Sequence, residues 1–267
     1  MNSLDMHDST EKPNDPLAEG FCNPPDGVTE PCLTYIARVM ELRDFVGFFF
    51  NFVKTSVALG GLVPQDARTQ ADVKAFAVLR YDYSKHRPFV NQIMLSRAIE
   101  SFDLYLTTTL RDIFLARPEM LKSEGSIDIA SVIEAGSYDE LILRISERKI
   151  HDLSYKSLGE LRKFIQSRTG IDLFHNDASF EMTVLASEVR NLIAHNDCVV
   201  NDIFRARIKR VSSQLDVSET GRVQITDEWL RRASYTLDGI VFRFDQLAAE
   251  KFALQTVNRM GAFILRT

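Results

Sequence analysis

Cysteine, proline and glycine are all scarce in this sequence. Its three cysteines, Cys22, Cys32 and Cys198, form no CxxC pair. This number and spacing argue against a disulfide framework and against a zinc site, so a reducing cytoplasm is the expected location. Only 12 glycines and 8 prolines occur in 267 residues, and five of the prolines precede residue 32. We therefore expect a helix-rich body that follows an irregular N-terminal arm.

Several motifs that define common site types are also missing. The sequence has neither a GxGxxG nor a GxxxxGK[ST] loop for phosphate binding, and no HExxH pair. Its five histidines are too scattered to predict a metal site, and no cofactor is expected. The net charge of −5 excludes a broad polycation that would coat nucleic acid without specificity, although a local basic patch is still compatible with it.

Long hydrophobic runs are absent as well. Residues 1–28 lack the basic and apolar segments of a signal peptide and are predicted to form a disordered arm. The most apolar stretch, FVGFFFNFV at 45–53, is far shorter than the roughly 20 residues of a membrane helix, so no membrane partner is expected. We interpret this stretch as a buried helix face, with a small exposed aromatic patch for a partner as the alternative.

What the sequence does contain is helical periodicity. Apolar spacing and capping residues predict helices over about 31–59, 88–117, 127–134, 137–150, 157–167, 176–196 and 226–252. The helix over 176–196 should begin at an N-cap, Asn176 or Asp177, and end at Asn196 as a left-handed stop. β-branched residues on both sides of SETG, residues 218–221, predict two short strands joined by a turn. The expected organisation is a disordered arm (1–28), a helical extension (29–84), a helical domain (85–255) and a C-terminal tail (256–267).

The predicted helix over 176–196 carries the most unusual cluster of residues. Leu185, Val189 and Leu192 fall on its apolar face, whereas Asn191 and His195, four residues apart, stack on the other side. Arg190 is long enough to bend toward the same surface. Histidine can move a proton in the breakage of a ribose–phosphate bond, and arginine can bind the phosphate and stabilise developing charge. The structural alternative is a surface ion pair of Arg190 with Glu188 or Asp197 and a favourable histidine at a helix end.

This cluster resembles the signature of the HEPN superfamily. The string RNLIAHN has an arginine followed by a polar residue, and its histidine comes after four intervening positions. The preceding SLGELRKFIQSRTGIDLF and the earlier SFDLYLTTTL also resemble a bacterial subgroup of RNA-cleaving and RNA-binding toxins and defence proteins. The resemblance covers roughly residues 85–255. One departure is that CVVN, after the motif, lacks the glycine that many relatives have at the turn.

The resemblance implies an up-and-down bundle of four or more helices with an added N-terminal helix. It implies a metal-independent endoribonuclease that leaves 2′,3′-cyclic phosphate and 5′-hydroxyl ends, in a toxin, defence or stress system. His195 would be the general acid or base, Arg190 the phosphate-binding residue and Asn191 the orienting residue, with Asp103 and Glu188 in supporting positions. The expected partners are RNA, a second copy that brings two motifs together across a cleft, and an antitoxin or regulatory protein.

A basic stretch, FRARIKR at 204–210, follows the motif. As a strand it would place Arg205, Arg207 and Lys209 on one face, with Arg210 next to them. One interpretation is a phosphate-binding track that leads to Arg190 and His195. The other is a solvated edge strand protected by its charges. The alternative function for the whole chain is a non-catalytic helical module for dimerisation and for binding RNA or protein.

Overall fold

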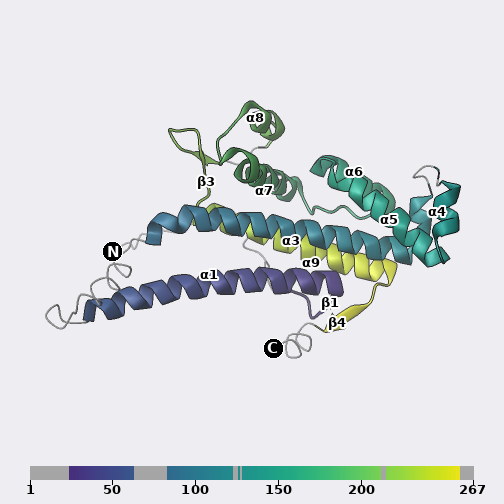
Figure 1. Cartoon of the computed structure of the whole chain (residues 1–267), viewed down its shortest axis with the longest axis horizontal. Helices are drawn as coiled ribbons and strands as arrows, with labels where there is room; N and C mark the ends of the chain where they lie inside the picture. Colours follow the sequence, from purple (N-terminus) through teal and green to yellow (C-terminus); the bar gives the residue numbers. More distant parts are fainter. Residues whose placement is uncertain (1–23, 63–82, 123–125, 127, 212–214, 259–267) are drawn as a thin grey trace, which may run out of the picture.

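The computed structural model describes residues 24–62, 83–122, 126, 128–211 and 215–258. This part of the chain is mainly helical (Figure 1), as predicted. Its helices are α1 Glu30–Leu62, α3 Arg87–Ala116, α4 Ile129–Glu134, α5 Tyr138–Ser154, α6 Leu158–Thr169, α7 Asp177–Asn196, α8 Asp202–Ile208 and α9 Asp227–Phe252, with short 3-10 helices η2 Tyr83–His86 and η3 Pro118–Leu121. The strands are β1 Gly27–Thr29, β2 Asp216–Val217, β3 Val223–Gln224 and β4 Thr256–Asn258.

Helices α3 and α9 form the centre of a bundle, with α1 packed on one side and α7 on the other (Figure 1). Asn91 near the start of α3 donates hydrogen bonds to Ile225 and Asp227 at the start of α9, so these two helices run parallel. Helix α1 runs antiparallel to both, because Thr29, just before α1, contacts Asp245 near the end of α9. The buried apolar residues of α1, α3, α7 and α9 belong to one continuous core.

Most helix boundaries follow the capping signals in the sequence. The side chains of Ser137, Ser157 and Thr226 each accept a backbone N–H at the start of a helix, as expected for N-caps. Pro118 follows α3, as expected for a residue that cannot continue a helix. Helix α6 ends at Gly170, whose φ of 65° lies in the left-handed region that glycine tolerates best. These local signals explain why the helix pattern could be predicted well.

Two short antiparallel strand pairs complete the fold. The predicted hairpin around SETG is confirmed as β2 paired with β3, with Val217 opposite Val223. The second pair joins the two ends of the described chain, because β1 pairs with β4 and Val28 lies opposite Val257. Gly27 and Val28 therefore belong to a strand, whereas the rest of the predicted disordered arm, residues 1–23, lies outside the described residues, as do residues 259–267 of the predicted tail.

The interpretation of the phenylalanine-rich run as a buried helix face is wrong for most of its rings. Phe45, Phe48, Phe49 and Phe52 are exposed, and only Phe50 is half-buried. The cause is that α1 is an outer helix, so only the side that meets α3 and α9 is covered. A segment with apolar residues all around its axis must then leave some of them in solvent when it occupies an outer position.

Candidate functional site

Helix α7 carries the motif and is fixed at its start by a capping box. The Asn176 side chain accepts the Ser179 backbone N–H at 2.8 Å, as predicted for an N-cap at this position. Leu185, Val189 and Leu192 are buried, so the apolar face faces the core as expected. The opposite side of the same helix carries the polar side chains of Asn191 and His195, which point away from the core face.

The end of α7 differs from the expected asparagine stop. Asn196 stays helical, and the left-handed positions are Asp197 and Cys198, with φ of 48° and 60°. Arg222 holds this turn, because its guanidinium donates to the Asp197 carbonyl and forms an ion pair with the Asp197 carboxylate, both at 2.7 Å. The buried Cys198 donates its backbone N–H to Leu192. Side-chain contacts thus hold a backbone conformation for which glycine is the usual solution.

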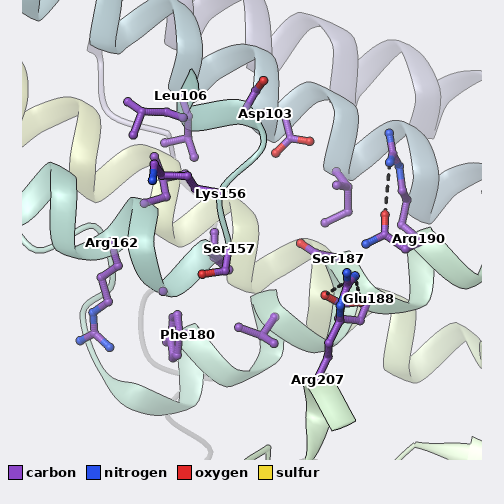
Figure 2. A pocket seen from close by; sticks show the side chains of 18 of the residues that line it. Asp103, Leu106, Lys156, Ser157, Arg162, Phe180, Ser187, Glu188, Arg190 and Arg207 are labelled. Atoms are coloured by element: carbon purple, nitrogen blue, oxygen red, sulfur yellow. Dashed lines mark hydrogen bonds and ion pairs between the residues drawn. The ribbon is translucent and has the colours of Figure 1, made fainter. Parts of the chain in front are cut away.

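Next to α7 lies a cleft of about 970 Å³, walled by α3, the end of α5, the start of α6, α7 and α8. Arg190 and Asn191 both line it, and Arg190 donates to the Asn191 side-chain oxygen at 3.4 Å. In Figure 2, Asp103 lies on the α3 wall of the cleft, and Arg190, Glu188 and Arg207 lie on the α7 and α8 side. The volume lies within the range of small-molecule and nucleotide sites.

His195 is exposed and does not line the cleft. It lies on the same side of α7 as Asn191, one turn further, which is about 6 Å along the helix axis. The structure therefore brings Arg190 and Asn191 together and places the imidazole just beyond them, open to solvent. A ligand that occupies the cleft beside Asn191 would have to extend along α7 to reach it.

Asp103 projects from α3 into the cleft opposite α7 (Figure 2). The loss of water among the surrounding cleft walls raises the pKa of Asp103 to about 6, although the side chain keeps an opening to solvent through the cleft. The nearby Arg190 guanidinium lowers this pKa, and Glu100 raises it. Within the part of the chain that the structure describes, Asp103 and Arg190 form no direct ion pair, so both groups remain available to a ligand.

The basic stretch after the motif is a helix, which corrects the prediction of a strand. Residues 202–208 form α8, with Phe204 buried and Ile208 half-buried, one turn apart against the core. Alternating apolar residues in FRARIKR fit both periodicities, so the pattern alone could not decide. The predicted common face of Arg205, Arg207 and Lys209 does not exist. Instead, Arg207 and Arg210, three residues apart, line the cleft, and Arg205 and Lys209 do not.

The ion pairs around the motif differ from the surface pairing considered for Arg190. Glu188 binds Arg207 at 3.1 Å, and Asp197 binds Arg222. Arg190 contacts neither carboxylate among the described residues, and its guanidinium donates to the neighbouring Asn191 instead. Glu188 therefore supports the site by fixing Arg207 on the cleft wall.

Sequence reasoning missed the wall opposite α7, which comes from the α5–α6 connection and α6. Lys156, Ser157 and Arg162 line this wall. Arg162 is held by Asp172 at 2.7 Å and by Asp177 at 3.3 Å. The Ser157 hydroxyl is the N-cap of α6. Only the N-cap role of Ser157 is visible in the sequence, because nothing there shows that this turn faces α7.

Comparisons with protein-family models, with curated proteins and with solved structures find no match for this chain. Among the described residues, no group of three or more histidine, cysteine, aspartate or glutamate side chains could hold a metal ion. No helix in the described ranges is long and apolar enough to cross a membrane.

Proposed function

We propose that this chain is a metal-independent endoribonuclease of the HEPN type that binds RNA in the cleft beside α7. The observation that supports this most directly is the position of three groups on one helix. Arg190 and Asn191 stand on the cleft wall, and His195 follows one turn later in solvent. A guanidinium, an amide and an imidazole in this order suit a ribose–phosphate linkage that runs along α7.

In the proposed reaction, the ribose 2′-oxygen attacks the adjacent phosphorus while the bond from phosphorus to the 5′-oxygen breaks. In one order, His195 takes the 2′-hydroxyl proton as general base and solvent protonates the leaving 5′-oxygen. In the other order, solvent takes the 2′-hydroxyl proton and His195 protonates the leaving 5′-oxygen. The products are a 2′,3′-cyclic phosphate and a 5′-hydroxyl. Arg190 binds the non-bridging oxygens and stabilises their growing charge, and Asn191 orients the guanidinium through its hydrogen bond.

The other charged groups of the cleft would position the strand rather than react with it. Arg207 and Arg210 stand on the α8 side, and Lys156 stands on the α6 side. These cations offer phosphate contacts on both sides of Arg190. We further propose a cytoplasmic role in defence, stress response or a toxin system, in which an antitoxin or regulatory protein blocks the cleft.

Purified full-length protein should cut single-stranded RNA in EDTA and leave cyclic phosphate ends, as judged by end-specific labelling. His195→Ala should reduce the rate by about 10²- to 10⁴-fold, the usual contribution of a general acid or base. His175→Ala is the matched control, because this exposed histidine lies before the opposite end of α7. Equal cleavage by His195→Ala and wild type would show that the catalytic assignment is wrong.

A non-catalytic binding module is the alternative, and one observation favours it. Four carboxylates, Asp103, Asp177, Glu181 and Glu188, share the cleft with Arg190, and His195 lies outside the cleft lining. For such a module, wild-type protein would bind RNA in a filter or anisotropy assay and cut none of it. His195→Ala would then bind RNA as well as wild type does.

A further inference from the structure

Four phenylalanines form a stripe on the outer surface of α1. Phe45, Phe48, Phe49 and Phe52, here called the α1 stripe, are between 37% and 70% exposed. Their spacing of three, one and three residues places them on one side of the helix. Phe50 lies on a different side, where Arg87 of α3 stands over its ring at 4.4 Å from the centroid. The stripe therefore faces away from the bundle.

The α1 stripe is as large as the largest apolar patch on a typical monomer. Taking roughly 200 Å² for one phenylalanine side chain, the four rings expose on the order of 450 Å². The largest apolar patch on a typical monomer is about 300–600 Å² and often has a binding role. A stable dimer buries about 800 Å² on each partner, so the stripe supplies more than half of that area before its polar neighbours are counted.

The phenylalanine rings of the α1 stripe are also pre-organised by contacts with neighbouring rings. Phe48 and Phe52 stack on each other with centroids 6.1 Å apart, and Phe49 meets Phe50 edge to face at 5.6 Å. Side chains held by their neighbours lose less freedom when a partner covers them. No charged residue interrupts the stripe between Phe45 and Phe52. These features are those of the apolar centre of an interface.

We propose that a second copy of this chain covers the α1 stripe, with the two α1 helices packed antiparallel about a twofold axis. A twofold interface must be complementary to itself, so each residue faces a position that is equivalent in reverse. The stripe has this property, because the intervals between its four phenylalanines are three, one and three residues in either direction along the helix. Phe45 of one copy then lies opposite Phe52 of the other, and Phe48 lies opposite Phe49.

This arrangement differs from a dimer in which two motifs meet across a cleft. Helices α1 and α7 lie on opposite sides of the α3 and α9 pair (Figure 1). Two copies joined through α1 therefore keep their clefts apart and open, one on each outer side. The inference does not depend on the proposed RNA chemistry, and His195→Ala should leave the dimer unchanged.

The first test is sedimentation of the full chain over a range of concentrations. Wild type should sediment as a dimer, and Phe48→Glu combined with Phe49→Glu should raise the dissociation constant at least tenfold while the circular dichroism spectrum stays helical. Phe89→Glu is the matched control, because Phe89 is 61% exposed on α3 and lies outside the stripe. A wild-type monomer at all concentrations, or a dimer that ignores the stripe variant, would overturn the proposal.

The second test concerns the antiparallel order. With Cys22→Ser as background and the described Cys32 and Cys198 buried, a mixture of Phe45→Cys and Phe52→Cys proteins should join through a short bismaleimide linker. Either protein alone should join much less. Equal joining in all three samples would overturn the antiparallel arrangement. Binding of the monomeric protein to phosphatidylcholine vesicles, lost in the stripe variant, would instead assign the stripe to a lipid surface and reject the dimer.

Discussion

Two places in the molecule raise the pKa of a carboxyl group by partial loss of water, but they contact it in opposite ways. In the core, Asp245 accepts hydrogen bonds from the backbone N–H and hydroxyl of Thr29 and from the Tyr105 hydroxyl. In the cleft, Asp103 has neither an ion-pair partner nor a side-chain hydrogen bond within the described part of the chain. The first group is fully used by the fold, and the second is left open.

The same difference holds for the cations beside them. Arg43 is committed to the buried Asp238 at 2.7 Å, and Tyr35 donates to the same carboxylate at 2.8 Å. Among the described residues, Arg190 hydrogen-bonds to Asn191 alone, at 3.4 Å. Burial raises the pKa of both Asp238 and Asp245, while their hydrogen-bond donors lower it. A polar group with complete contacts serves the structure, and one with incomplete contacts in a cleft is a candidate for function.

The largest expected effect separates these roles through Arg190. Arg190→Ala should lower RNA cleavage by about 10²- to 10³-fold, because a donor to developing negative charge contributes that much in other enzymes. The melting temperature should change little, since the guanidinium has one weak contact within the protein. Cleavage assays with matched thermal melts check both parts. An Arg190→Ala variant that cleaves RNA normally but has a lowered melting temperature would show that Arg190 serves the structure and not the function.

Asp245→Ala should do the opposite. It leaves the backbone N–H and hydroxyl of Thr29 buried without this acceptor, while the Tyr105 hydroxyl keeps the Val241 carbonyl, and the loss costs about 2–4 kcal/mol of unfolding free energy. Urea unfolding of this variant beside Asp103→Ala measures the contrast, and we expect a change within about 1 kcal/mol for Asp103→Ala. If the two variants lose equal stability, Asp103 is a structural residue as well.

The pH dependence of ligand binding should sharpen the role of Asp103. Below its pKa of about 6 the carboxyl is neutral, and above it the negative charge competes with phosphate for Arg190. Binding of a short RNA should therefore weaken as pH rises through about 6, by up to roughly tenfold for a nearby like charge. Because the folded pKa is raised above the value of 3.8 for a free aspartate, the contribution of this group to the free energy of unfolding falls as pH rises from 3.8 to about 6.

Asp103→Asn should remove most of this dependence and tighten binding at pH 7.5. His195→Ala, measured in parallel, separates the contribution of the imidazole beyond the cleft from that of the Asp103 carboxyl group. A binding curve for Asp103→Asn with the slope of wild type would assign the pH effect to another group.

The smallest expected effect distinguishes two arginines of the basic stretch. Arg210→Ala should reduce the slope of log RNA affinity against log salt concentration by about 0.7 in magnitude, the value for one lost phosphate contact to a single strand. Arg205→Ala should change it less, because Arg205 does not line the cleft. Titrations at several salt concentrations check this, and equal slopes for the two variants would show that RNA does not pass α8 in the proposed way.

Much of the fold could be predicted because its signals are local. The caps at Ser137, Ser157, Asn176 and Thr226 mark helix starts without reference to anything distant. The stretch at 204–210 was misassigned because its alternating residues fit a strand, and only the burial of Phe204 with Ile208 beside it reveals a helix. The phenylalanine run was misassigned because a sequence does not show which helix of a bundle lies outside.

The sequence predicted which candidate residues lie together on α7, but not which residues face α7 across the cleft. Arg190, Asn191 and His195 lie on one helix, so their relative order follows from helical geometry. The opposite wall, with Lys156, Ser157 and Arg162, comes from a connection whose direction depends on the packing of α5 and α6. The left-handed turn at Asp197 and Cys198 also depends on a distant residue, Arg222, that no nearby pattern indicates.

The pairing of β1 with β4 has a consequence for how the chain is made. The Thr29 contacts to Asp245 join positions 216 residues apart, so the first described strand and helix cannot complete their packing until α9 has been synthesised. During translation, α1 can pack on α3 as soon as that helix is made, but β1 and the start of α1 lack their β4 and α9 partners until the end of the described chain is synthesised. The newborn N-terminal segment is therefore a natural client for chaperones, and slowing translation before α9 should increase its aggregation.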